Sequence, residues 1–278
     1  MKGQALARST PGWSAWESDL KATKNPSLPA VLFVSLFLIA FPARALDSID
    51  TDGPDFVESS EVVPKGHFQY EIDMSSVRTA RPAPSDTMQS TPTLLKYGAT
   101  DNIELRIVPQ GYVRQDGKSG VGETAFGIKW HSQDRDQSRG KPAVSWILHF
   151  DTPSGSEQFR GNGIRPSLRS VITWELPSDL ALGLMPGIKY DRREDGQRFT
   201  SAILGVVLNK RFNERFRGFI EFSAAQIAHA GDGGVLAGWD VGIAYLFNND
   251  FQLGLRAGVA ANQNSPSSHV LFEMAQRF

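Results

Sequence analysis

Five charged residues occupy positions where an alternating strand pattern would turn them away from their apolar neighbours. Arg106 lies between Leu105 and Ile107, and Lys129 lies between Ile128 and Trp130. Successive side chains of a β-strand point to opposite faces, so each charge falls on the face opposite its neighbours. The full set is Arg106, Lys129, Arg169, Glu221 and Arg256. Gathered on one surface, charges of both signs would face a passing solute, set up a transverse field and select weakly among solutes.

Hydrolytic chemistry is the main alternative for this polar face. Ser145 and His149 share one face of a predicted strand, but four residues of strand separate them by about 13 Å. A nucleophile and its base must lie within hydrogen-bonding reach, so this pair fails the test. His67 and His269 fall on the first and last predicted strands. We interpret all of these as ordinary polar residues and predict no catalytic residue.

Metal, cofactor and nucleic-acid functions have little support in the sequence. The chain has no cysteine, which excludes thiol catalysis and cysteine-ligated zinc. Asp232 lies among glycines without the spacing of a calcium loop, and no phosphate-binding glycine motif opens a helix. Residues 46–278 contain 24 basic and 28 acidic residues, so there is no basic surplus for nucleic acid. We predict no metal, no cofactor and no nucleic-acid partner.

The elements that would position these charges are short alternating runs, each bounded by Gly, Pro, Asn, Asp or Ser. No stretch shows a sustained helical period. One run, 199–210, is apolar on both faces, and for it we predict that Ala202, Leu204, Val206 and Leu208 face outward. The runs predict twelve strands, at about 67–79, 91–97, 103–110, 123–130, 143–150, 167–175, 180–191, 199–210, 216–224, 239–247, 251–259 and 269–278.

Alternation alone also fits a soluble β-sandwich, so the connections between strands matter. They alternate in length. Short ones are expected at 98–102, 177–179, 210–214 and 248–250, and longer ones at 80–91, 112–121, 152–165 and 228–236. Transmembrane barrels have short turns at one end and longer loops at the other. The link 131–141 is an exception, because its place in the series predicts a short turn.

Aromatic residues gather at the strand ends on the apolar face, where a bilayer's two interfaces favour them. One set is Phe68, Tyr97, Trp130, Trp174, Phe247, Phe251 and Phe278, and the other is Phe150, Tyr190 and Trp239. The predicted lipid-facing positions at mid-strand carry no charge. These patterns predict an all-β protein: a closed, antiparallel, up-and-down transmembrane β-barrel of about twelve strands. Pro186, in mid-strand, predicts a β-bulge.

The sequence divides into three parts. The apolar run 30–41 is too short to span a bilayer comfortably, and Ala43-Arg44-Ala45 follows it as a small-x-small cleavage pattern. We therefore interpret residues 1–45 as a signal peptide. Residues 46–66 form an acidic N-terminal segment, which is either a leader or a plug inside the barrel. Residues 67–278 form the predicted barrel.

The start of the acidic segment carries a family resemblance. It reads Thr51-Asp52-Gly53-Pro54-Asp55, then Val57-Glu58-Ser59, and Val63-Pro64-Lys65-Gly66 leads into the first strand. This resembles the outer-membrane barrel family named for the meta-pathway of phenol degradation, whose members are porin-like transporters. Gly53 stands where that family usually has Arg. The resemblance implies an outer-membrane protein that aids uptake of aromatic or other hydrophobic compounds.

Together these observations predict a non-enzymatic channel or transporter in the cell outer membrane for small solutes, with aromatic or hydrophobic ones included. An outer-membrane barrel hydrolase and a structural or adhesive barrel without transport are the alternatives. The expected partners are outer-membrane lipid, a small-molecule solute and the barrel assembly machinery. The last strand presents Val270, Phe272, Met274 and Phe278 outward and resembles the signal that this machinery recognises, although Gln276 departs from it.

Overall fold

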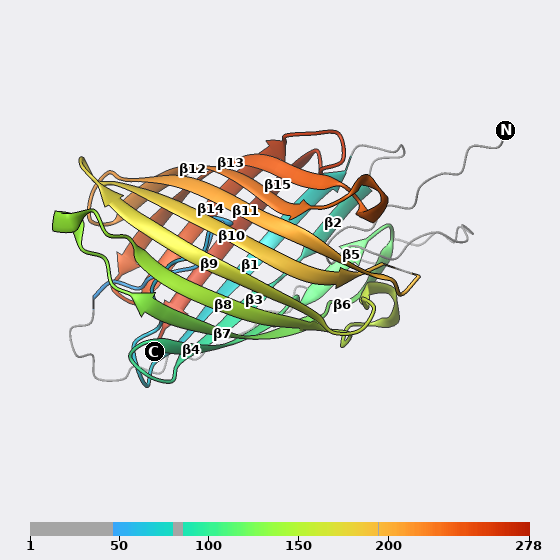
Figure 1. The fold of residues 1–278 in the computed structure, drawn as a ribbon, viewed down its shortest axis with the longest axis horizontal. Coiled ribbons are helices and arrows are strands. Elements are labelled where there is room, and N and C mark those ends of the chain that lie inside the picture. Colours follow the sequence, from blue (N-terminus) through green and yellow to red (C-terminus); the bar gives the residue numbers. More distant parts are fainter. Residues whose placement is uncertain (1–46, 80–85, 194) are drawn as a thin grey trace.

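The computed structural model describes residues 47–79, 86–193 and 195–278, and the predicted signal peptide 1–45 lies outside them. Nearly all of the regular structure is β (Figure 1). The strands are β1 (Phe68–Thr79), β2 (Asp86–Ser90), β3 (Thr93–Gly98), β4 (Ile103–Pro109), β5 (Tyr112–Gln115), β6 (Lys118–Val121), β7 (Thr124–Gln133), β8 (Ala143–Thr152), β9 (Arg165–Leu176), β10 (Leu180–Arg192), β11 (Arg198–Arg211), β12 (Phe216–Ile227), β13 (Val235–Asn248), β14 (Phe251–Ala260) and β15 (Ser268–Arg277).

Three short 3-10 helices lie in the connections: η1 (Gln137–Arg139), η2 (Glu157–Phe159) and η3 (Ala230–Asp232). Within the described residues, no helix is long and apolar enough to cross a membrane.

The strands form one antiparallel sheet that closes on itself because β1 pairs with both β3 and β15. Three pairs of short strands, β2 with β3, β4 with β5 and β6 with β7, each make one long barrel strand with a break. The breaks, at 91–92, 110–111 and 122–123, lie on adjacent strands. Counted in this way, the wall is a twelve-stranded closed barrel (Figure 1), as the sequence predicted.

The two ends of the barrel differ. At the end that we call the turn end, the links are 99–102, 177–179, 212–215 and 249–250, and the last residue, Phe278, hydrogen-bonds Phe68 there. The opposite, or loop, end carries longer connections, two of which contain η2 and η3. The link 134–142 is long although it lies at the turn end, so the exception predicted for it is confirmed.

Alternate residues face the lumen and the outside of the barrel. Val207 is 2% exposed, whereas its neighbour Leu208 is 39% exposed, and Ile147 and Leu148 differ in the same way. The predicted facing of 199–210 is therefore confirmed. A row of exposed apolar side chains runs across five adjacent barrel strands in register, namely Leu105, Ile128, Leu148, Leu168 and Ile188.

The bulge predicted at Pro186 is wrong. Pro186 pairs in register with Leu204 on β11, and no shift occurs there. On the other side, the pairing with β9 is interrupted between Leu184 and Gly187 and resumes in the same register. Proline has no N–H to donate, so the ladder can lose that bond without an extra residue being inserted.

A cationic side chain at Ile128, which belongs to the exposed apolar row and lies near the middle of the β6–β7 wall strand, is expected to destabilise the barrel. Ile128→Arg places a charge at mid-depth, which costs about 2–4 kcal/mol, whereas the matched change Val121→Arg near the loop end costs about 0–1 kcal/mol. Urea unfolding in lipid vesicles measures both free energies. Equal costs at the two positions would contradict the assignment of this row to the lipid interior.

Candidate functional site in the barrel lumen

The N-terminal segment, residues 47–66, lies inside the barrel. Its backbone N–H groups donate to wall carboxylates: Asp52 to Glu71 Oε1 on β1 (3.1 Å), Val63 to Glu104 Oε2 on β4 (2.9 Å), and Val57 to Glu221 Oε1 on β12 (2.7 Å). Strands β4 and β12 lie opposite each other in the ring of twelve. The segment therefore crosses the lumen and touches opposite walls.

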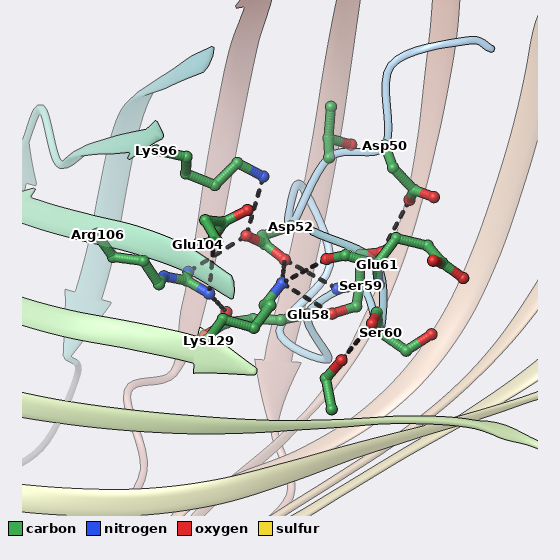
Figure 2. Close-up of polar contacts among 12 residues, drawn as sticks. Asp50, Asp52, Glu58, Ser59, Ser60, Glu61, Lys96, Glu104, Arg106 and Lys129 are labelled. Atoms are coloured by element: carbon green, nitrogen blue, oxygen red, sulfur yellow. Dashed lines mark hydrogen bonds and ion pairs between the residues drawn. The ribbon is translucent and has the colours of Figure 1, made fainter. Parts of the chain in front are cut away.

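The Asp52 carboxylate is the most highly bonded group of the segment. Its Oδ1 lies 2.6 Å from Lys129 Nζ, and its Oδ2 lies 3.0 Å from Lys96 Nζ and 3.2 Å from Arg106 Nη2. Figure 2 shows these three cations, from β3, β4 and β7, converging on Asp52. One carboxylate thus joins three neighbouring barrel strands.

A second carboxylate extends the same contact along the wall. Glu58 Oε2 lies 2.6 Å from Arg106 Nη1, and Glu58 Oε1 lies 2.6 Å from Arg169 Nη1 on β9. We call the four wall cations Lys96, Arg106, Lys129 and Arg169 the basic cluster. Arg106 is shared between Asp52 and Glu58, so the two carboxylates and four cations form one network.

Lys96, Arg106 and Lys129 of the basic cluster are buried, which makes their partners essential. The Lys129 side chain is 0% exposed, and its ammonium bonds Asp52 Oδ1 and the carbonyl oxygens of Ser59 and Glu61. Within the described part of the chain, these are all of its hydrogen bonds and ion pairs, and all belong to the N-terminal segment. A buried charge that loses its partners is strongly destabilising.

The same contacts control the protonation of the segment. Burial alone disfavours the charged form of Glu58, but Arg106 and Arg169 outweigh it and lower its pKa from 4.5 to about 2. Burial also disfavours the charged form of Asp52. Three cations outweigh this effect and together hold the pKa of Asp52 well below its usual range, namely Lys129, Lys96 and Arg106. Both carboxylates are therefore ionised at neutral pH.

The opposite wall holds the segment by different means. Arg217 on β12 donates to the carbonyl of Gly53 (3.0 Å) and pairs with Asp55, and Gln252 donates to Thr51 Oγ1 (2.7 Å). The Val57 side chain packs into the apolar part of the lumen, in a buried cluster with Ile147, Val171, Met185, Val207 and Phe219. Apolar burial thus adds to the polar contacts.

Small wall residues make room for that packing. A Cβ added at Gly205 would lie 2.6 Å from a Val57 methyl, and one at Gly183 would lie 3.0 Å from the other methyl. Both distances are too short for a side chain to fit without movement. The wall is therefore shaped around Val57.

The five lumen-facing residues predicted from sequence fall into three groups. Arg106, Lys129 and Arg169 come together in the basic cluster, and Glu221 faces them across the lumen and accepts hydrogen bonds from Phe56 and Val57. Arg256 lies on β14, apart from the cluster, and its buried Nε has no hydrogen-bond partner among the described residues.

Sequence reasoning missed Lys96, which completes the basic cluster from β3. The sequence pattern could have identified it, because Lys96 lies between the apolar residues Leu95 and Tyr97 and so faces the lumen like the other wall charges.

Ser145 is the serine of the hydrolase alternative. In the structure it lies near His131 and not near His149, the histidine with which the sequence pairs it. Ser145 Oγ lies 3.4 Å from His131 Nδ1, and His131 Nε2 lies 2.9 Å from Asp134 Oδ1. However, the Ser60 carbonyl oxygen lies 2.8 Å from His131 Nδ1 and also accepts the Ser145 hydroxyl proton. Because a carbonyl only accepts, Nδ1 carries the proton and cannot serve as a base towards Ser145.

The other histidines make structural contacts. His149 Nδ1 accepts a hydrogen bond from Arg169 Nη2 (2.8 Å), and His269 Nε2 lies 2.6 Å from Asp240. His67 lies at the turn end beside Phe278, whereas His269 pairs with Val77 near the loop end. The two histidines on the terminal strands are therefore far apart.

A cavity of about 1000 Å³ opens beside the segment at the turn end. Its lining contains five acidic residues of the segment (Asp47, Asp50, Asp55, Glu58 and Glu61), three acidic residues of the wall and turns (Glu175, Asp179 and Glu214), and four arginines (Arg135, Arg211, Arg215 and Arg217). The segment therefore supplies most of the negative charge at this mouth.

Gly53 is close to the wall at β15. A Cβ at this position would lie 2.2 Å from Glu273 Oε1, and the buried Oε2 of Glu273 has no hydrogen-bond partner among the described residues. The wall thus presents a carboxylate beside Gly53, the residue that departs from the N-terminal motif.

Comparison with known families agrees with this architecture. The family described as "Putative MetA-pathway of phenol degradation" matches residues 51–278. The chain belongs to this family. The match begins at Thr51, so the phenol-degradation family includes the lumenal segment as well as the barrel, and the resemblance inferred from the N-terminal motif is confirmed. No curated protein sequence matches the chain.

Solved structures share the fold of this member of the phenol-degradation family at low sequence identity. The COG4313 outer membrane channel from Pseudomonas putida F1 is 14% identical, with a TM-score of 0.62 over 79% of this chain and 98% of that one. The NanC porin is 10% identical, with a TM-score of 0.51 over 74% of this chain and 97% of that one. These likenesses support the barrel fold.

Neutralising the two segment carboxylates is expected to loosen the segment. The chain has no native cysteine, so Ser60→Cys gives a single thiol at a position that is 3% exposed. Adding Asp52→Asn and Glu58→Gln should raise its maleimide labelling rate by about tenfold or more, because charge-assisted bonds are worth about 1.5–3 kcal/mol each. A thiol at exposed Lys118 should label equally fast in both backgrounds. An unchanged rate at position 60 would argue against the network.

Acid is expected to loosen the segment only well below the usual range of a glutamate. Docking lowers the Glu58 pKa from 4.5 to about 2, so its stabilisation is complete above pH 4.5 and is lost as the pH falls through about 2. Labelling of Ser60→Cys with a dipyridyl disulfide, which reacts with thiols in acid, should therefore stay slow down to pH 4.5. Glu58→Gln should flatten this acid response. A transition centred near pH 4.5 in the parent would be inconsistent with a docked Glu58.

Proposed function

We propose that the chain is an outer-membrane channel for small solutes, aromatic and hydrophobic compounds included, and that the N-terminal segment closes its lumen. The observation that carries this proposal is the position of the segment. It crosses the lumen of a closed barrel and is held there by ion pairs and hydrogen bonds to opposite walls.

The kind of attachment favours a closure that opens. No disulfide holds the segment to the wall, because the chain has no cysteine, and the strongest contacts of its side chains are ion pairs. Such contacts exchange for water or another ion when the segment moves, at a cost set by the buried charges left behind. Twelve strands lie between eight-stranded barrels, which side chains can fill, and porins of 16–18 strands with open channels. A narrow passage is therefore the expected product of opening.

Membership of the phenol-degradation family supports aromatic or hydrophobic compounds among the solutes. The fold shared with an outer membrane channel supports the choice of a channel in the outer membrane, where the exposed apolar row contacts lipid. The outward residues of the last strand support recognition by the barrel assembly machinery, since Val270 is half exposed and Phe278 packs on Tyr70.

The hydrolase alternative is less well supported. The serine and histidine that come together both give their protons to the Ser60 carbonyl, which belongs to the segment. A structural barrel would need no charged segment through its lumen, so the ion-pair network also favours transport over a purely structural role.

Opening the lumen is expected to raise conductance. In planar bilayers, the parent protein should show small or rare current steps, and deletion of residues 47–61 should give steps several-fold larger, because the segment no longer obstructs the passage. The control is Lys118→Gln, an exposed change at the loop end. Equal conductance of parent and deletion would remove the basis for closure, and a folded deletion variant without current steps would remove the basis for a channel.

A further inference from the structure

We propose that the basic cluster is a binding site for the carboxylates of small organic anions, and that Asp52 and Glu58 occupy it in the closed barrel in place of solute. This inference rests on the proposed channel function and names a substrate class for it. It follows from the ion pairs that the four wall cations keep when their contacts with the N-terminal segment are left out.

The wall supplies too few acids for its own cations. Lys96 has Glu71 as a wall partner at 2.5 Å, and Arg106 has Glu104 at 3.7 Å. Among the described residues, Lys129 and Arg169 have ion pairs only with the segment, to Asp52 and Glu58 respectively. Without the segment's contacts, the cluster therefore contains four cations and two carboxylates, and Lys129 and Arg169 lose their only acidic partners.

The cluster is arranged for carboxylates in particular. Three cations surround the two oxygens of Asp52, and two guanidinium groups hold one oxygen each of Glu58. Guanidinium and ammonium groups from fixed strands at 2.6–3.2 Å are the usual surroundings of a bound carboxylate. Arg106 contacts both acids, so the site has room for two carboxylates side by side.

Unused donors remain in the same place. The Nε atoms of Arg106 and Arg169 are buried and have no hydrogen-bond partner among the described residues. His149 accepts from Arg169 through Nδ1 and so holds that guanidinium towards the lumen. A ligand with more oxygen atoms than Asp52 and Glu58 provide can therefore gain bonds that the segment does not make.

The segment also reverses the charge along the path. Residues 47–61 contain six acidic residues and no basic one. At the turn-end cavity, removing the segment's five lining acids leaves three carboxylates beside four arginines. The closed lumen is therefore acidic at this mouth, whereas the open lumen is weakly basic and leads to the basic cluster. An uncharged solute cannot replace the segment's carboxylates, but an organic anion can.

The test is equilibrium binding to the folded, detergent-solubilised protein. The probes are succinate, a dicarboxylate, and succinamide, its neutral counterpart, titrated by calorimetry. The variant Asp52→Asn/Glu58→Gln removes the competing carboxylates and should bind succinate about tenfold or more tightly than the parent does. It should bind succinamide no better than the parent. Equal affinity for the two probes, or no succinate binding by this variant, would overturn the proposal.

The wall side is tested in the same background. Adding Lys129→Gln and Arg169→Gln should abolish succinate binding, whereas the matched control Lys118→Gln with Arg198→Gln, which removes two exposed charges near the loop end, should retain it. Retention of the folded barrel is checked by the gel mobility of unheated samples. If the first double variant fails to fold, Arg169→Gln alone should still weaken binding several-fold. Undiminished binding in a folded cluster variant would overturn the site.

Reversal potentials separate this inference from the proposed function. In a KCl gradient, the Asp52→Asn/Glu58→Gln channel should favour chloride, and the cluster substitutions should reduce that preference. Conductance with a preference for potassium would overturn the anion site and leave the channel intact. Succinate binding without conductance in any variant would support the site and overturn the channel.

Discussion

The ionised carboxylate of Asp52 is the interaction on which the lumen depends. It joins cations on β3, β4 and β7, and without it a wholly buried lysine keeps no acidic partner. A barrel wall with inward charges at alternate positions must neutralise them, because burying an isolated charge is costly. This chain does so with a segment of its own. The barrel's interior is consequently a complex between wall and segment.

That constraint explains why the segment follows an irregular path. Its backbone donates to Glu71, Glu104 and Glu221, its carboxylates meet the basic cluster, and Val57 enters the apolar part of the lumen. The segment thereby supplies hydrogen-bond donors to the wall carboxylates, carboxylates to the wall cations and an apolar side chain to the apolar part of the lumen. The segment's attachment is therefore distributed over the circumference of the barrel, with Asp52 as its most highly bonded group.

The strands could be predicted from sequence because side chains in a membrane barrel alternate strictly between the lipid face and the lumen face. Outward charges are costly there, so the alternation of Leu105, Arg106 and Ile107 fixes the orientation of a whole strand. The breaks at 91–92, 110–111 and 122–123 were read as strand ends, since Pro92, Gly111 and Gly122 usually mark turns. Only pairing with neighbouring strands shows that the wall continues past them.

The contacts of the segment could not be predicted in this way. Residues 47–66 have no periodicity, and the partners are far apart in sequence, as Asp52 and Lys129 are (77 residues) and Val57 and Glu221 are (164 residues). Oxidative cross-linking tests the central placement most directly. Ser60→Cys with Ser145→Cys should form an intramolecular disulfide in the folded barrel, because Ser145 bonds the Ser60 carbonyl, whereas Ser60→Cys with Ser223→Cys on β12 should not. Absence of the first disulfide, or equal yield of both, would contradict a segment docked in the lumen.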